Sequence, residues 1–279
     1  MKILKNICAA VILLLCSCAL FACAGDSKPL TLNLNTTLGV WWWDNRLDSS
    51  YLTFAESNGV DEIYYYTSTF DENNKSFIES AASYNISVYW LTGDYTWIEN
   101  PQDFYNEMEK YLSFQESSAH KFAGVHLDVE PHQHPQFEER RNELITKYVE
   151  FIYNVTNRYP QVSFDVDIPF WLEDEITFEN ETKEAYKFLM DYADRTFIMS
   201  YRDSAEGIVN VASDELNYAS TINKEIFLGV ETGEEEDIVT FLQEGKNYLY
   251  NELNNLNKFT ELNYNVSIHH IKTWKNLKN

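Results

Sequence analysis

The chain lacks cysteine outside its first segment. Its 279 residues include four cysteines, and all of them lie within the first 23 positions, at Cys8, Cys16, Cys18 and Cys23. The remainder therefore offers no disulfide, no thiolate nucleophile and no cysteine-based zinc site. Its stability must come from a hydrophobic core, which a domain of about 240 residues can supply.

Basic residues are scarce as well. Lys and Arg total 21 against 44 Asp and Glu, which gives a formal net charge of −23 at pH 7. Loss of Lys2 and Lys5 with an N-terminal leader would make the remainder more negative still. Such an acidic surface argues against nucleic-acid binding and against adhesion to anionic lipid. Solubility alone explains the charge equally well.

The first 22 residues have the pattern of a secretory signal peptide. A short basic start (residues 1–5) precedes an apolar run that ends at Leu20, which is too short and too early for a stable membrane span. Residues 20–23, Leu-Phe-Ala-Cys, resemble a bacterial lipobox, which implies cleavage before Cys23 and its lipidation. An ordinary secreted protein cut nearby is the alternative. We expect an extracytoplasmic protein with a tether over residues 23–36, attached to the membrane only through its lipid.

Residues 37–279 show a repeated order of strand-like and helix-like segments. Apolar runs typical of strands occupy residues 38–43, 60–67, 86–92, 122–129, 162–168, 196–201, 226–230 and 266–270. Amphipathic helical patterns occupy residues 51–57, 74–84, 103–117, 137–158, 184–193, 205–221 and 238–256. This order predicts a single α/β domain, a (β/α)8 TIM barrel. No glycine-rich phosphate motif follows the first strand, which argues against a dinucleotide-binding doubly wound fold.

The fourth predicted strand carries ionisable residues on one face. His126, Asp128 and Glu130 alternate with apolar residues, and alternation at period two puts them on the same side of a strand. Burying three such groups costs several kcal/mol unless each has a partner, so we interpret them as a working site. Glu130 is the expected general acid/base, because a neighbouring carboxylate and an apolar setting both raise a carboxyl pKa.

Glu231 ends the seventh predicted strand between two nearby glycines. In a barrel it would face Glu130 across the mouth, where active sites of this fold lie. The pair could then act as in retaining glycosidases, whose two carboxyl groups lie about 5–5.5 Å apart. Alternatively, Glu231 belongs to the solvated acidic run that follows at residues 234–236.

Asp165 and Asp167 alternate with apolar residues on the fifth strand. They could hold sugar hydroxyls, orient Glu130 or take part in a metal site. They could equally be structural acids paired with Arg158 or Arg202.

The remaining strand ends supply further candidates for substrate binding. Tyr201 can hydrogen-bond a developing charge, and Arg202 can hold a carboxylate with two hydrogen bonds. One of His269 and His270 should point into the mouth. Trp43 and Trp274 could stack on sugar rings, and all seven tryptophans lie near predicted strand ends or loops.

Three segments resemble the family 18 chitinases. Residues 122–130 are similar to that family's strand-four signature, which ends in the catalytic Glu, and residues 199–201 and 227–230 are similar to its sixth and seventh strands. The resemblance implies that Glu130 is the acid and that Asp128 and Tyr201 steady a substrate acetamido group, which attacks the sugar carbon. The chain departs from the family at His126, where the series has an Asp, and in the late position of Trp274.

A second resemblance is to the large glycosidase clan with its acid/base on strand four and its nucleophile on strand seven. Glu130 and Glu231 match these positions, whereas Val129 stands where that clan usually has an Asn. We therefore expect an extracytoplasmic glycoside hydrolase that acts on a polysaccharide or glycan and needs no cofactor.

Two other functions are open at this point. A metal-dependent hydrolase or deacetylase could bind a divalent ion such as zinc through histidines and acids. Its candidate ligands are His126, Asp128, Glu130, His132, His134, Asp165, Asp167, His269 and His270. The third possibility is a glycan-binding lipoprotein without catalytic activity, since a fold does not guarantee a function.

Overall fold

The computed structural model describes residues 30–44 and 46–279. Residues 31–279 form one compact unit. The predicted leader and the lipidation site at Cys23 lie outside the described residues. Within the described part, no helix combines the length and the apolar character that crossing a bilayer requires.

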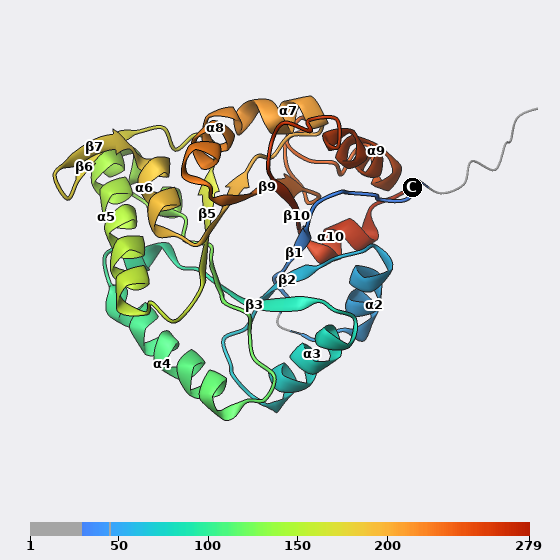
Figure 1. The fold of residues 1–279 in the computed structure, drawn as a ribbon, viewed down its shortest axis with the longest axis horizontal. Helices are drawn as coiled ribbons and strands as arrows, with labels where there is room; N and C mark the ends of the chain where they lie inside the picture. The colour runs from blue at the N-terminus through green and yellow to red at the C-terminus, as the bar shows by residue number, and fades with distance from the viewer. Residues whose placement is uncertain (1–29, 45) are drawn as a thin grey trace, which may run out of the picture. The chain divides into compact units, whose positions relative to one another are not determined.

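Eight parallel strands close into a barrel, as predicted for a single (β/α)8 fold (Figure 1). In chain order the strands are β1 (Leu38–Trp42), β2 (Glu62–Tyr66), β3 (Ser87–Thr92), β4 (Val125–Leu127), β5 (Phe164–Pro169), β8 (Arg195–Met199), β9 (Glu225–Glu231) and β10 (Asn265–His269). Around the ring the order is β1-β10-β9-β8-β5-β4-β3-β2. Every predicted strand is present, with ends shifted by a few residues at most.

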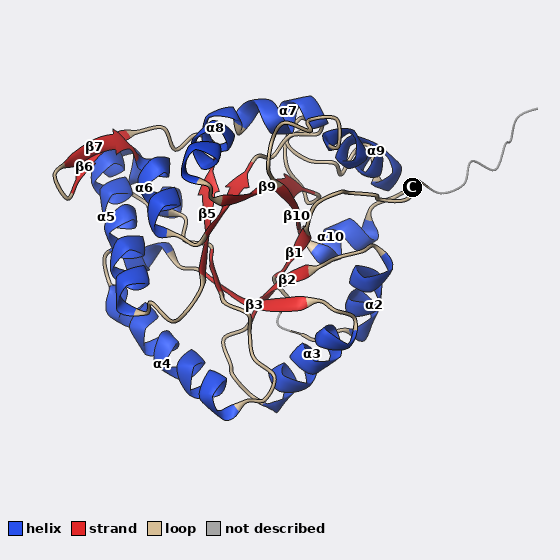
Figure 2. Ribbon diagram, viewed as in Figure 1, coloured by secondary structure: helices blue, strands red, loops and turns tan. Residues whose placement is uncertain are grey.

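The helices surround the barrel (Figure 2). They are α2 (Ser49–Ser57), α3 (Glu72–Ser83), α4 (Pro101–Ser117), α5 (Phe137–Arg158), α6 (Ala185–Tyr192), α7 (Ala205–Val211), α8 (Ser213–Ile222), α9 (Lys246–Leu256) and α10 (Ile271–Asn276). Two short 3-10 turns, η1 (Tyr95–Ile98) and η2 (Pro131–Gln133), follow β3 and β4. Asp48 and Asp71 begin α2 and α3, each accepting hydrogen bonds from backbone N–H groups of the first turn.

The structure differs from the predicted elements in four places. The helix predicted at 238–256 begins only at Lys246, because Thr240 bridges back to Glu231 and donates to the Gly233 carbonyl oxygen. The helix predicted at 205–221 divides at Ala212 into α7 and α8. An unpredicted hairpin, β6 (Glu175–Phe178) with β7 (Glu181–Glu184), lies between β5 and α6, and α10 follows the last strand, where no helix was predicted.

Strand alternation divides the core into two layers. On β1, Trp42 points outward and packs on Tyr51 of α2 and Phe77 of α3, with ring centroids 5.3 and 5.2 Å apart. Trp41 points the other way, into the barrel. There it belongs to a small aromatic cluster made of Trp41, Tyr64, Leu91, Phe197 and Phe227. This cluster fills the interior of the barrel below its mouth.

Candidate active site at the carboxyl ends of the strands

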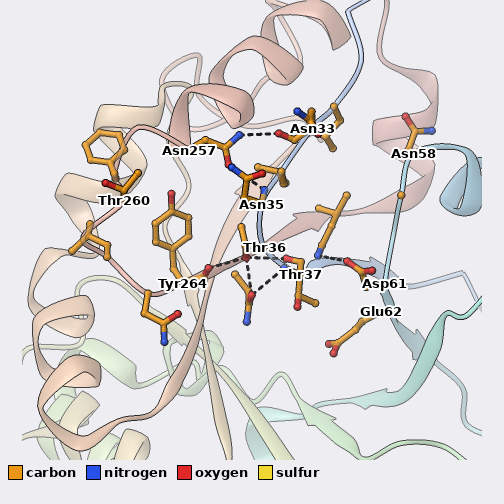
Figure 3. Close-up of a pocket in the computed structure, with 18 of the residues that line it drawn as sticks. Asn33, Asn35, Thr36, Thr37, Asn58, Asp61, Glu62, Asn257, Thr260 and Tyr264 are labelled. Atoms are coloured by element: carbon orange, nitrogen blue, oxygen red, sulfur yellow. Dashed lines mark hydrogen bonds between the residues drawn. The ribbon is translucent and has the colours of Figure 1, made fainter.

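The barrel has a cavity at each end. The cavity at the amino ends has a volume of about 1000 Å³ and is lined by asparagines and threonines (Figure 3). Several of these side chains already bind the backbone of the segment that leads into β1. Asn257 donates to the carbonyl oxygen of Asn33 and accepts from the N–H of Asn35, and Asp61 accepts from the N–H of Leu38. This cavity is therefore the place where the chain enters the barrel.

The cavity at the carboxyl ends has a volume of about 730 Å³ and contains the predicted chemistry. Its lining residues come from the ends of six strands and the loops behind them. They are Trp43, Gly93, Asp94, Tyr95, Asp128, Glu130, Gln133, Met199, Tyr201, Glu231, Glu235, His269 and His270. Active sites of (β/α)8 enzymes lie at this end of the barrel, so we treat it as the candidate site.

Glu130 lies just after β4, at the start of η2, where Pro131 ends the extended segment. Its side chain is 21% exposed. Burial and the negative charge of Asp167 raise the pKa of Glu130, although a hydrogen bond from Gln133 acts in the opposite direction. A carboxyl group with a raised pKa can carry a proton near neutral pH and deliver it to a leaving group.

Asp128 lies two residues before Glu130 and opens into the same cavity. Its Oδ1 atom is buried and has no hydrogen-bond partner among the described residues. Burial, followed by the charges of Asp167 and Glu130, raises the pKa of Asp128 well above its ordinary value. The site thus holds a second carboxyl group whose neutral form is favoured, beside the candidate acid.

The surroundings of Glu231 shift its pKa in the opposite direction to those of Asp128 and Glu130. Burial alone would raise the pKa of Glu231, but hydrogen bonds from His269 and from the backbone lower it. Oε2 lies 2.6 Å from Nδ1 of His269, and Oε1 accepts from the N–H groups of Thr232 at 2.7 Å and Gly233 at 2.5 Å. The structure therefore separates Glu231, which is only 5% exposed, from the solvated acidic run that follows it.

Trp43 fixes the tautomer of His269. Its indole N–H donates to Nε2 of His269 at 2.9 Å, so Nε2 acts as an acceptor and Nδ1 carries the proton that binds Glu231. Two predicted sugar-binding residues thus also orient the candidate nucleophile. His270 lines the cavity as well and begins α10, and burial lowers its pKa to about 4.

Tyr201 lies among the carboxyl groups of the site. Burial raises the pKa of Tyr201 well above its ordinary value, and the charges of Glu231, Asp128, Asp167 and Glu130 add to this effect. Its hydroxyl group therefore stays protonated and can donate a hydrogen bond to a substrate oxygen.

A buried ion pair lies directly below the cavity. Nε2 of His126 is 2.8 Å from Oδ2 of Asp167, and the indole N–H of Trp41 lies 3.2 Å from the same oxygen. Burial alone would lower the pKa of His126, but the charges of Asp167 and Asp165 raise it to about 9. His126 is therefore a cation at neutral pH, enclosed between strands.

A second ion pair lies deeper in the barrel. Arg195, at the start of β8, makes two hydrogen bonds to Asp165 at 2.8 and 2.6 Å, and its Nη1 contacts Glu62 of β2 at 2.8 and 3.0 Å. Nδ1 of His126 lies 3.6 Å from Asp165. The two ion pairs thus join residues of β2, β8, β5 and β4 across the interior.

Five residues predicted to contact substrate are absent from the cavity lining: His126, Asp165, Asp167, Arg202 and Trp274. His126 and Asp165 are completely buried beneath the mouth. The partner of Asp165 is Arg195, not Arg158 or Arg202. Arg202 stacks on Phe170 at 4.7 Å and lies outside the cavity lining.

Trp274 also lies outside the cavity lining. It is fully buried on α10, with its ring 4.9 Å from that of Phe54, because the chain turns into a helix directly after His270. Asp167 also lies under the cavity rather than in its lining, since it is 2% exposed and bound to His126. Its contacts are with other side chains of the site.

Asp94, Gln133 and Glu235 are among the lining residues to which the sequence assigned no role. Asp94 ends the turn after β3 and begins η1, Gln133 binds Glu130, and Glu235 lies on the loop after β9. Asp94 had a detectable signal, since it is an acid directly after a predicted strand. Glu235 had none, because it stands in a run of four acids.

The proposed metal ligands do not converge. In residues 30–44 and 46–279, no group of three or more His, Asp or Glu side chains is arranged to hold a metal ion. His126, Asp165 and Asp167 are instead joined in the ion pairs described above.

Known structures share this fold. A variant of the glycoside hydrolase domain of PelA from Pseudomonas aeruginosa is 11% identical, with a TM-score of 0.50, and the match covers 85% of this chain and 96% of that one. A family 17 β-1,3-glucanosyltransferase from Rhizomucor miehei is 8% identical, with a TM-score of 0.51 and coverages of 84% and 86%. A chitinase from Chromobacterium violaceum is 15% identical, with a TM-score of 0.47 and coverages of 71% and 68%.

No protein-family model matches the sequence, and no curated protein does so either. At these identities the first two structures show the fold, a barrel also found in carbohydrate-active enzymes, and nothing finer.

Proposed function

We propose that this protein hydrolyses glycosidic bonds, with Glu130 as general acid/base and Glu231 as nucleophile. The proposal rests on two carboxyl groups in one cavity whose surroundings shift their pKa values in opposite directions. Burial and nearby charge raise the pKa of Glu130, whereas hydrogen bonds lower that of Glu231. Environments that push two pKa values apart identify an acid and a base in many enzymes.

The mechanism follows from the different surroundings of Glu130 and Glu231. Glu130 gives its proton to the glycosidic oxygen while a carboxylate oxygen of Glu231 attacks the sugar carbon, which forms a glycosyl ester and releases the first sugar product. Oε2 is the attacking atom, because Oε1 already accepts two backbone hydrogen bonds and Oε2 accepts one from His269. A water molecule then attacks the sugar carbon of the ester while Glu130 takes a proton from that water. The second sugar product leaves, and Glu231 returns to its carboxylate form.

Asp128 favours a second route on N-acetylated substrates. Its buried Oδ1 has no partner among the described residues and can bind the N–H of an acetamido group. The acetamido oxygen would then attack the sugar carbon in place of Glu231. This route needs Glu130 and Asp128 and leaves Glu231 outside the bond-forming step.

Hydrolysis of a broad glycan panel by the full chain tests both routes. Glu130→Gln, Glu231→Gln and Asp128→Asn are compared with Glu236→Gln, an exposed acid outside the cavity lining. Loss of general acid/base catalysis lowers the rate by about 10²–10⁴-fold. We expect such losses in Glu130→Gln and Glu231→Gln, and a rate for Glu236→Gln equal to that of the parent.

The pattern of losses separates the possibilities. An unchanged rate in Glu231→Gln with a loss in Asp128→Asn, on N-acetylated sugars only, would favour the acetamido route. Activity that EDTA abolishes would favour the metal-dependent hydrolase. Glycan binding that survives Glu130→Gln, without turnover in the parent, would identify a binding protein.

The leader supports an extracytoplasmic location for this activity. We propose that Cys23 is lipidated after cleavage, because a basic start, an apolar run and a lipobox-like sequence precede it. Metabolic labelling with a radioactive fatty acid tests this. Label in the parent and its absence in Cys23→Ser would support the anchor, whereas label-free secretion of the parent would contradict it.

A further inference from the structure

The lining of the mouth is rich in carboxyl groups. Five carboxyl groups line the cavity, and no Lys or Arg is among the lining residues. They are Asp94, Asp128, Glu130, Glu231 and Glu235. Of the two lining histidines, His270 has its pKa lowered to about 4 by burial, and His269 is bound to Glu231 through Nδ1.

Asp94 and Glu235 are exposed carboxylates without a cationic partner. Neither lies within 4.0 Å of a Lys or Arg nitrogen in the part of the chain that the structure describes. Glu99, a few residues after Asp94, shows the contrast, since it pairs with Arg140 at 2.6 Å and Lys147 at 2.8 Å. Glu99 is thus compensated by two cations, whereas Asp94 and Glu235 have no such partner among the described residues.

The two carboxylates lie on opposite sides of the mouth. Asp94 follows β3 and Glu235 follows β9, and these strands are four positions apart in the ring of eight. Glu130 and Glu231 come from the neighbouring strand β4 and from β9 itself. A linear glycan that crosses the mouth over the catalytic pair would therefore pass one carboxylate on each side of the bond to be cleaved.

Asp128 lines the same cavity, and its buried Oδ1 has no partner among the described residues. An ammonium group has three N–H donors and no acceptor, which suits a carboxyl oxygen. A cleft lined by charge of one sign also concentrates ligands of the opposite sign and repels those of the same sign.

We propose that the substrate is a cationic glycan whose 2-amino groups are not acetylated, with Asp94 and Glu235 as the residues that select its charge. This inference rests on the proposed function, since it assumes that the same cavity binds the glycan. The carboxylates of the mouth should repel glycans rich in uronic acids, and fully acetylated glycans should bind less tightly than cationic ones.

Calorimetric binding of three hexasaccharides tests the inference. Full chain carrying Glu130→Gln, which prevents turnover, is titrated with hexamers of glucosamine, N-acetylglucosamine and galacturonic acid at about 50 mM and about 500 mM NaCl. We expect the glucosamine hexamer to bind about tenfold more tightly than the acetylated one at low salt. High salt should remove most of this difference, and the galacturonate hexamer should not bind.

Two double variants test whether Asp94 and Glu235 cause the preference for the cationic hexamer. Asp94→Asn with Glu235→Gln removes the two mouth charges, and Glu234→Gln with Glu236→Gln removes two exposed charges outside the lining. An exposed ion pair is worth a few-fold in affinity, so the first pair should lose about tenfold for the glucosamine hexamer alone. The second pair should bind as the parent does.

Three binding results would overturn the inference: no binding of the glucosamine hexamer, affinity for the acetylated hexamer that is equal or higher, or equal losses in both double variants. Turnover of a neutral glycan without charge preference would overturn it and leave the hydrolase proposal standing. Charge-dependent binding without any turnover in the parent would support the charge preference and remove the hydrolase proposal.

Discussion

His269 and Glu231 form a short contact at the end of adjacent strands, with Nδ1 of the imidazole 2.6 Å from Oε2 of the carboxylate. The contact is held from behind by Trp43, which donates to the other imidazole nitrogen at 2.9 Å. Two predicted substrate-binding residues, Trp43 and His269, and the candidate nucleophile Glu231 thus form one hydrogen-bonded row. The row gives the candidate nucleophile a lower pKa and one preferred orientation.

Replacing His269 should move the acid limb of the pH–rate profile. His269→Ala removes a hydrogen bond to an ionised group, which is worth about 1.5–3 kcal/mol, so the pKa of Glu231 should rise by about one to two pH units. Activity should then fall at a correspondingly higher pH as the solution is acidified. The dependence of kcat/KM on pH measures this limb.

His270→Asn is the matched control for that experiment. Asn can still begin α10, and His270 makes no hydrogen bond to Glu231 among the described contacts. Its acid limb should lie where that of the parent does. An unmoved limb in His269→Ala would show that this contact does not set the ionisation of the nucleophile.

The buried cation at His126 predicts a specific dependence of stability on pH. Its pKa in the folded protein is about 9, against an ordinary value of 6.5. Because the folded pKa is the higher one, the stabilisation is complete below about pH 6.5 and is lost as the pH rises to about 9. The difference corresponds to about 3 kcal/mol in the free energy of unfolding. Asp165, Asp167, Arg195 and Tyr64 are the ionisable groups nearest to the ring.

Urea unfolding at several pH values between 6 and 9 measures this dependence. His126→Gln should be less stable at pH 6 and should lose the decline above pH 6.5. His120→Gln, at a histidine whose side chain is 40% exposed, should retain the decline. A flat profile in the parent would mean that His126 is uncharged when folded.

Arg195 should be essential for stability. Arg195→Met would leave Asp165 and Glu62 without their cation, and breaking a buried ion pair in this way costs about 3–5 kcal/mol. Arg195→Lys should recover only part of the loss, because a single ammonium group cannot reproduce the two-pronged contact with Asp165. Thermal and urea unfolding provide the measurement.

Arg202→Met serves as the comparison, since that guanidinium stacks on Phe170 and donates to a backbone oxygen. A cost below about 1 kcal/mol is expected there. Equal losses at the two arginines would contradict the ion-pair account of the interior.

Trp274 and Trp43 should give opposite results when replaced. Trp274→Ala removes a fully buried ring from the core, which costs about 3–5 kcal/mol in stability, and should leave glycan affinity unchanged. Trp43→Ala opens the wall of the mouth and frees His269, so glycan affinity should fall by about tenfold with a smaller effect on stability. Unfolding curves measure the stability of both variants, and glycan titrations measure their affinity. A loss of glycan affinity in Trp274→Ala at unchanged stability would restore the original prediction for that residue.

The barrel could be predicted because its evidence is local. Apolar runs of strand length alternate with amphipathic stretches, and helix α5 lies where its pattern placed it, at residues 137–158. The meeting of Glu130 and Glu231 in one cavity also followed from position alone, since both end barrel strands. Their catalytic roles stay predictions.

What the sequence could not provide was the choice of partners. Asp165 and Arg195 are 30 positions apart, with an unpredicted hairpin between them, and only the pairing of β5 with β8 brings them together. Arg158 and Arg202 were equally plausible by distance along the chain. Trp274 was placed at the mouth because the short helix α10 gave too few residues for a clear period.

The interior ion pairs also limit how this barrel can change. Glu62, Arg195, Asp165 and His126 come from four different strands, and each balances the charge of another. A replacement at one position leaves a neighbouring buried charge without its partner, whereas Asp94 and Glu235, on the loops after β3 and β9, have no cationic partner among the described residues. Mutant libraries for altered substrate specificity should therefore vary the loops after β3 and β9 and leave these four residues unchanged.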